Sequence, residues 1–137
     1  MKFELLTKYI MQIEEDSHGE WIIDKEGDGT PENPYHFPFV HYSKLIHEFE
    51  EDVYAFCEAH PEYDHYNYGK TLEDNGMKWG SSLSSVDVSK LDAKAIIAMI
   101  VGAIRAERFC DGALLGFLKD GSILKWLKRL EEIDKES

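Results

Sequence analysis

The sequence predicts a mainly α-helical, multi-helix globular domain, or an α+β domain with a small β element near residues 20–42. Apolar residues recur at helical spacing along most of the chain. A nearly continuous apolar run, Ala95–Ile104, has to be buried on most of its sides. With 137 residues, the chain has the length of one domain and can bury a core without disulfides. We therefore expect a single domain over residues 1–137.

The N-terminal third combines a helix with the candidate β element. A first helix is expected near residues 2–15, because apolar residues repeat there every three or four positions. The short segment Glu20–Asp24 can form a strand. Glycines and prolines make residues 25–34 a loop. The aromatic segment His36–His41 is β-prone, but its proline limits it to an edge strand or an extended conformation.

The middle of the chain predicts two further helices. Ser43 has the residue type of an N-cap, and one apolar face continues from it to about His60, where a proline follows. The apolar face consists of Ile46, Phe49, Val53 and Phe56. A short helix is expected over residues 63–75 and ends at Gly76. Residues 77–88 are rich in serine and glycine and predict a connection.

The C-terminal part predicts a buried central helix and two helices that follow it. Asp92 is the expected cap of a helix over residues 93–109, and Gly112 breaks the chain. Short and long helices should follow over residues 113–119 and 122–134. We expect the central helix to pack against the last one through Ile97, Ile100, Val101, Ile104, Trp126, Leu127 and Leu130.

The charge of the chain is unevenly distributed. Residues 1–66 hold 16 Asp and Glu but 4 Lys, which accounts for the whole net charge of −12, whereas residues 67–137 are balanced. An acidic protein is a poor match for phosphate, so nucleic acid is not the expected partner. The acidic half is either a solvated face or a docking face for a basic partner. A second candidate surface for a protein partner is aromatic and consists of Trp21, Tyr35, Phe37 and Phe39.

Metal, cofactor and catalytic signatures are weak throughout the sequence. Asp24-x-Glu26-x-Asp28 resembles the start of a calcium loop, but Tyr35 stands where the bidentate glutamate is needed. Six histidines form no known ligand motif, and the spacing of His60 and His65 is a poor metal signature. We therefore predict no metal, no cofactor and no catalytic residue.

The cellular setting is inferred from what the sequence lacks. The N-terminus has no secretory signal, and the longest apolar run is shorter than a membrane span. Cys57 and Cys110 have no paired spacing, so both are expected to be buried free thiols. These features predict a cytoplasmic protein that does not contact membranes.

The charged block that follows the apolar run is the candidate site. Arg105, Glu107, Arg108 and Asp111 begin close to the core, where unpaired charges are unfavourable. In one interpretation the block is a structural clamp, in which the guanidinium of Arg108 is mostly buried and pairs with Asp111 or Glu107. In the other, Arg105 and Arg108 converge on a carboxylate or phosphate ligand.

The same block carries a family resemblance. The run R-A-E-R-F-C-D-G over residues 105–112, followed by a D-G turn and a leucine-rich helix, resembles the bacterial family called domain of unknown function 6508. That family has an R-x-x-R-F-C-(D/E)-G block at this place. The resemblance covers residues 93–133 well and residues 41–80 loosely. It implies a bacterial protein and no known activity.

Three functional interpretations follow. The first is a non-catalytic binding or interaction module. The second is a small enzyme or anion-binding protein with its site at Arg105, Arg108 and Asp111. The third is a regulator in which helices 113–119 and 122–134 form a helix-turn-helix that binds DNA through Lys125, Lys128 and Arg129. Four acidic residues directly after those cations argue against the third interpretation. The oligomeric state is not predicted.

Overall fold

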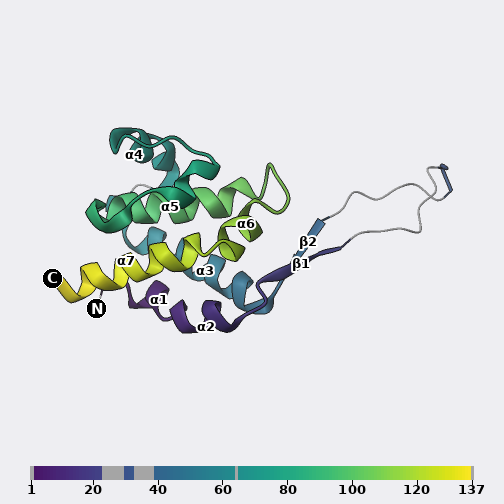
Figure 1. Ribbon diagram of the computed structural model, residues 1–137, viewed down its shortest axis with the longest axis horizontal. Helices are drawn as coiled ribbons and strands as arrows, with labels where there is room; N and C mark the ends of the chain where they lie inside the picture. Colours follow the sequence, from purple (N-terminus) through teal and green to yellow (C-terminus); the bar gives the residue numbers. More distant parts are fainter. Residues whose placement is uncertain (1, 23–29, 33–38, 64, 137) are drawn as a thin grey trace.

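The computed structural model describes residues 2–22, 30–32, 39–63 and 65–136. It confirms a mainly α-helical protein with a small antiparallel β element. Helices form one body, and a two-stranded ribbon, β1–β2, leaves this body at one end (Figure 1). The N- and C-termini lie near each other on the body, where the backbone amide of Phe3 donates to Asp134 Oδ2 at 3.0 Å. Among the described residues, no helix has the length and apolar character that crossing a membrane requires.

The N-terminal segment is two short helices rather than the single helix predicted over 2–15. Helix α1 covers Glu4–Thr7 and α2 covers Ile10–Glu15. The amide of Tyr9 donates to the carbonyl of Leu6 at 3.1 Å, so the chain tightens between the two helices. The apolar side chains nevertheless keep facing the core, which is why the periodicity continues across the break.

The β element is a two-stranded antiparallel ribbon. Strand β1 is Gly19–Ile22 and β2 is Phe39–Tyr42, with Gly19 paired to Tyr42. A Cβ at Gly19 would lie 2.8 Å from the carbonyl oxygen of His41, so a side chain does not fit there. The predicted calcium-like loop and most of the segment between the strands lie outside the described residues.

In the middle of the chain, the residues predicted to begin and end the helices lie at helix ends. Helix α3, Lys44–Ala59, begins at Ser43, whose side chain accepts a hydrogen bond from the amide of Ile46. The four apolar positions predicted for its inner face are buried. The helix predicted over residues 63–75 is shorter in the structure: α4 covers Tyr68–Asp74, and Gly76 follows it with a φ of +75°. Four short 3₁₀ helices complete this part: η1 Pro61–Tyr63, η2 His65–Asn67, η3 Ser81–Ser85 and η4 Val88–Lys90.

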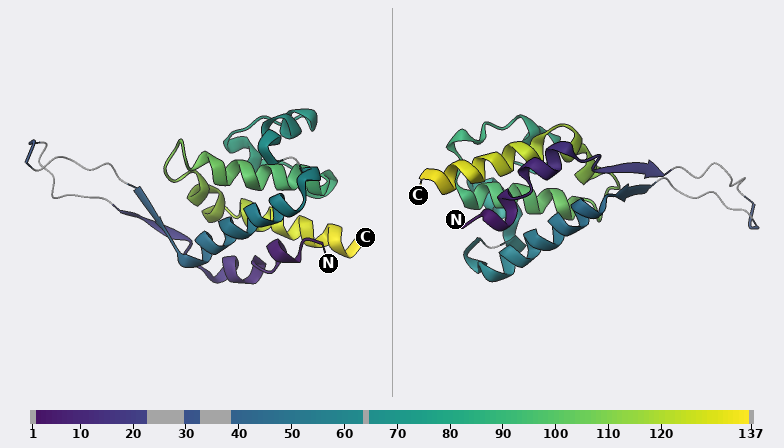
Figure 2. Two further views of the ribbon diagram at one scale, coloured as in Figure 1. Left: turned by 180° about the vertical axis from the view of Figure 1, so that it is seen from behind. Right: turned by 90° about the horizontal axis from the view of Figure 1, so that it is seen from below.

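The core is built around the helix α5, Ala93–Ala106. The side chain of Asp92 accepts from the amide of Ala95 at 2.9 Å, and every residue from Ala95 to Ile104 is buried. Figure 1 shows α5 between α4 and the last helix, α7, Ser122–Glu136, and Figure 2 shows α3 in front when the molecule is seen from behind. The predicted contact residues of α5 and α7 are all buried. Helix α5 ends at Ala106 instead of residue 109, because the chain then turns into α6, Ala113–Lys119.

Candidate functional site at the turn between α5 and α6

The turn between α5 and α6, residues 107–112, is organised by the carboxylate of Glu107. This carboxylate accepts hydrogen bonds from the amides of Gly112, at 3.0 and 3.1 Å to its two oxygens, and of Leu114 at 3.1 Å. The hydroxyl of Tyr42 also donates to it at 2.5 Å and accepts from the amide of Leu115 at 3.0 Å. Glu107 and Tyr42 therefore satisfy backbone donors that the first turn of a helix leaves unpaired.

Ionisation is shifted around this carboxylate. Burial first, and then the hydrogen bond to Glu107, raise the pKa of Tyr42 well above its usual value, so its hydroxyl stays protonated and keeps donating. Burial also raises the pKa of Glu50 on α3, an effect that the nearby charge of Glu107 reinforces and His47 opposes. Burial therefore favours the protonated form of the Glu50 carboxyl.

The structure corrects our expectation for Arg108. Its side chain is exposed rather than buried, and so is that of Asp111. Within the described part of the chain, neither Arg108 nor Arg105 forms an ion pair with a carboxylate. The physical reason is the early end of α5, which turns Glu107 toward the backbone amides and leaves Arg108 on the solvent side. The clamp exists, but Glu107 and Tyr42 form it.

The two arginines lie beside tyrosines from neighbouring helices. The guanidinium of Arg105, which is partly exposed, lies 5.8 Å from the centroid of the Tyr68 ring. Burial raises the pKa of Tyr54 on α3, and the positive charges of Arg108 and Arg105 partly oppose this rise. Both cations therefore influence the ionisation of the same tyrosine.

A pocket of about 390 Å³ opens on the surface beside the turn. We call it the turn pocket, and it is lined by Trp79, Gly80, Ser84, Ala106, Cys110, Gly112, Ala113, Gly116, Phe117 and Asp120. Most of these residues are small or aromatic, so the walls are predominantly apolar. The rings of Trp79 and Phe117 lie 5.7 Å apart, and a Cβ at Gly116 would meet no atom within 4 Å. The pocket volume is in the range of small-ligand and side-chain sites.

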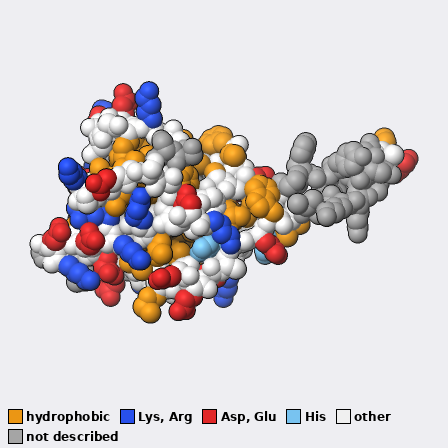
Figure 3. Space-filling view, in the orientation of Figure 1, with side chains coloured by type: hydrophobic (Ala, Val, Ile, Leu, Met, Phe, Trp, Pro, Cys, Tyr) orange, Lys and Arg blue, Asp and Glu red, His pale blue; other side chains and the backbone are white. Residues whose placement is uncertain are grey.

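Three exposed aromatic side chains belong to the turn pocket or to residues next to its lining. The side chain of Phe109 is 87% exposed, and those of Trp21 and Trp79 are 47% and 40% exposed. Trp21 lies against Gly112, which has a φ of +90° and whose Cβ position would be 2.3 Å from the indole. Figure 3 shows hydrophobic side chains gathered at the end of the body from which the ribbon leaves.

The cysteines and the aromatic patch differ from expectation in part. Both thiols are free and Cys57 is buried, with its pKa raised by burial to about 11, but Cys110 is exposed. Trp21 and Phe39 are each about half exposed, yet their register places them on opposite faces of the ribbon. Tyr35 and Phe37 lie outside the described residues. The sequence did not point to Trp79, which is far from the turn in the chain and becomes its neighbour through folding.

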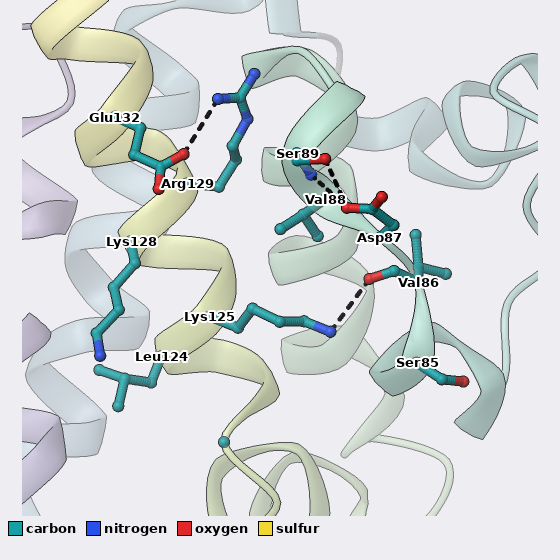
Figure 4. Close-up of a pocket in the computed structure, with 11 residues that line it drawn as sticks. Ser85, Val86, Asp87, Val88, Ser89, Leu124, Lys125, Lys128, Arg129 and Glu132 are labelled. Carbon is teal, nitrogen blue, oxygen red and sulfur yellow. Dashed lines mark hydrogen bonds and ion pairs between the residues drawn. The ribbon is translucent and has the colours of Figure 1, made fainter.

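A second cleft, of about 650 Å³, lies between α7 and the segment from η3 to η4 (Figure 4). Lys125 Nζ donates to the carbonyls of Ser84 and Val86 at 2.8 and 3.1 Å. Arg129 donates to the carbonyl of Leu91 at 3.2 Å and pairs with two glutamates of α7. Two of the three cations considered for DNA binding therefore hold the chain together, whereas Lys128 remains exposed.

Ligand groups for a metal do not converge in the described ranges: no three His, Cys, Asp or Glu side chains there lie close enough to hold an ion.

A comparison with known protein families matches residues 2–136 of the chain to DUF6508, a family of unknown function. No curated protein and no solved structure matches the chain.

Proposed function

The chain belongs to DUF6508, a family of unknown function, and from this starting point we propose that it is a non-catalytic binding module. The module holds an apolar side chain of a protein partner in the turn pocket. The observation that carries the proposal is this open, apolar pocket together with two exposed aromatic residues: Trp21, which lies against the lining residue Gly112, and Phe109, which precedes the lining residue Cys110 in the chain. Exposed apolar patches of this kind mark interaction sites, since contact of aromatic rings with water is unfavourable and burial in an interface removes it.

The chemistry of the charged block supports binding rather than catalysis. Glu107 has both carboxylate oxygens engaged by backbone amides and by Tyr42, so it is a structural group. Asp111 and Arg108 are exposed, and exposure leaves them without the low-dielectric setting that strengthens catalytic electrostatics. These charges are well placed to contact the polar part of a partner around an apolar anchor.

Selection of peptides tests the proposal. A random peptide library screened against the folded protein should yield peptides with a large apolar anchor residue. Gly116→Leu should abolish their binding, because the new side chain enters a space in which a Cβ meets nothing. Gly69→Leu on α4 is the matched control, since a Cβ there also meets nothing and Gly69 does not line the turn pocket. The proposal is refuted if the selected peptides have the same affinity for the Gly116→Leu variant as for the original protein.

The acidic half of the chain is the second proposed contact surface. Its excess negative charge favours a partner whose own surface is basic. Such a contribution weakens with added salt, because exposed charges are screened over about 8 Å at physiological ionic strength. Repeating the binding measurement at low and high salt therefore separates it from apolar anchoring, which salt does not weaken.

A second candidate function is anion binding by Arg105 and Arg108. The observation that favours it is that both guanidinium groups lack a carboxylate ion-pair partner among the described residues. Titration with inorganic phosphate, followed by NMR, should shift signals near Tyr54, and Arg105→Ala should remove the shift. Lys94→Ala, an exposed cation on the same helix, is the control. A response that survives Arg105→Ala would argue against this site.

A further inference from the structure

The turn that borders the turn pocket also carries a side chain suited to fill it. Phe109 lies one residue before Cys110, which lines the pocket, yet Phe109 itself is not among the lining residues and is 87% exposed. A chain therefore cannot be filling its own pocket with this ring. A protruding apolar group and an apolar recess on one short turn form a self-complementary surface.

Resting on the proposed function, we propose that the partner is a second copy of this chain, and that each copy inserts Phe109 into the turn pocket of the other. A twofold axis at the turn makes the two insertions equivalent, as in isologous dimers, where residue i meets j and j meets i. The rings of Trp79 and Phe117 form an aromatic wall of the pocket. An incoming phenyl ring can pack against such a wall edge-to-face.

The charges around Phe109 complement themselves under the same symmetry. Arg108 precedes it and Asp111 follows it, both are exposed, and neither has an ion-pair partner within the described residues. A twofold axis brings the Arg108 of one copy toward the Asp111 of the other. The block of residues 105–112 carries two arginines and two acidic residues, so it is neutral. It therefore offers two acidic chains a place to meet with little repulsion.

The contact should be weak. A phenyl ring buries about 150–250 Å², so two insertions and the surfaces around them fall below the roughly 800 Å² per partner of a typical stable complex. We therefore expect a dimer that forms and dissociates with concentration. Such an equilibrium is observable by sedimentation velocity of the full chain from micromolar to millimolar concentration.

Two variants remove the two halves of the contact. Phe109→Ala deletes the inserted ring, and Gly116→Leu fills the recess. Each should leave the chain folded, because the first ring is exposed and the second position has open space. Each variant alone should stay monomeric at every concentration. The controls Met11→Ala, a 72% exposed apolar residue on α2, and Gly69→Leu on α4 should dimerise like the original chain.

A mixture of the two variants provides the decisive test. The Gly116→Leu chain still carries its Phe109, and the Phe109→Ala chain still has an open pocket. One insertion is therefore restored in the mixed pair, which should associate although neither variant does so alone, and more weakly than the original chain. The mixed pair is detected by labelling one variant with a fluorophore and sedimenting it with an excess of the other.

The outcomes separate this inference from the proposed function. A chain that is monomeric at all concentrations, or a mixture that fails to associate, overturns the second copy as partner. If selected peptides then still bind the original chain and not Gly116→Leu, the binding module stands with a different partner. If peptides fail as well, the turn pocket is not a binding site. Dimerisation that survives both single variants overturns the insertion of Phe109.

Discussion

Replacing Tyr42 by phenylalanine removes one hydroxyl group that makes two hydrogen bonds at the start of α6. The hydroxyl donates to Glu107 and accepts from the buried amide of Leu115. A hydrogen bond to a charged group contributes about 1.5–3 kcal/mol, and a buried amide left without an acceptor costs about 1–3 kcal/mol. Because both effects arise at one site, we expect Tyr42→Phe to lower the free energy of unfolding by about 2–4 kcal/mol.

Thermal and urea unfolding followed by circular dichroism measure this loss. For a chain of this length the expected decrease in melting temperature is roughly 7–14 °C. Tyr9→Phe is the matched control, since the Tyr9 hydroxyl donates to Asp52, which keeps Lys8 and solvent as partners. Its loss should be clearly smaller, because no backbone amide is left unpaired.

A double-mutant cycle then tests the connection between the two side chains. Glu107→Ala should also destabilise the fold, and the double variant should cost clearly less than the sum of the two single changes, since they share a hydrogen bond. If Tyr42→Phe costs under about 0.5 kcal/mol, a typical surface effect, or if the two changes are additive, Glu107 and Tyr42 do not form the clamp described above.

Three further predictions concern the core, the exposed arginine and the buried carboxyl. Leu127→Ala should lower the free energy of unfolding by about 2–5 kcal/mol in urea titration, because the side chain is fully buried between α7 and its neighbours. Arg108→Ala should change the melting temperature little, within the roughly 0.5 kcal/mol of surface substitutions; a large decrease would restore the buried pair that we first expected. Burial raises the pKa of Glu50, so its ionisation opposes folding and stability should fall as pH rises through that raised pKa. Glu50→Gln should therefore raise the melting temperature at neutral pH but not at acidic pH, and an equal effect at both would contradict this account.

Local patterns in the sequence predicted most of the helical framework. The cap residues Ser43 and Asp92 and the buried run Ala95–Ile104 occupy their predicted places, because capping and burial are decided by neighbours in the sequence. The sequence did not predict the break between α1 and α2. The side chains keep one face across it, so periodicity alone does not reveal a tightened backbone.

The candidate site was predictable in position but not in detail. The charged block does lie at the end of the buried helix, but Arg108 was assigned the role that Glu107 fills. Which charge turns inward depends on where α5 ends, and the carboxylate that turns inward bonds to Tyr42, a residue that is distant in the sequence. The turn pocket brings Trp79 to Gly116, and no spacing rule connects residues so far apart in sequence.

The junction between the ribbon and the turn has a mechanical consequence. Tyr42 ends β2 and bonds to Glu107, while Trp21 of β1 rests on Gly112. Strand β2 is thus attached to the turn at its inner end, and β1 is attached through its third residue, so the ribbon and the turn are joined at two points. Because Gly112 also lines the turn pocket, we expect a partner bound to the ribbon to act on the pocket through these two contacts.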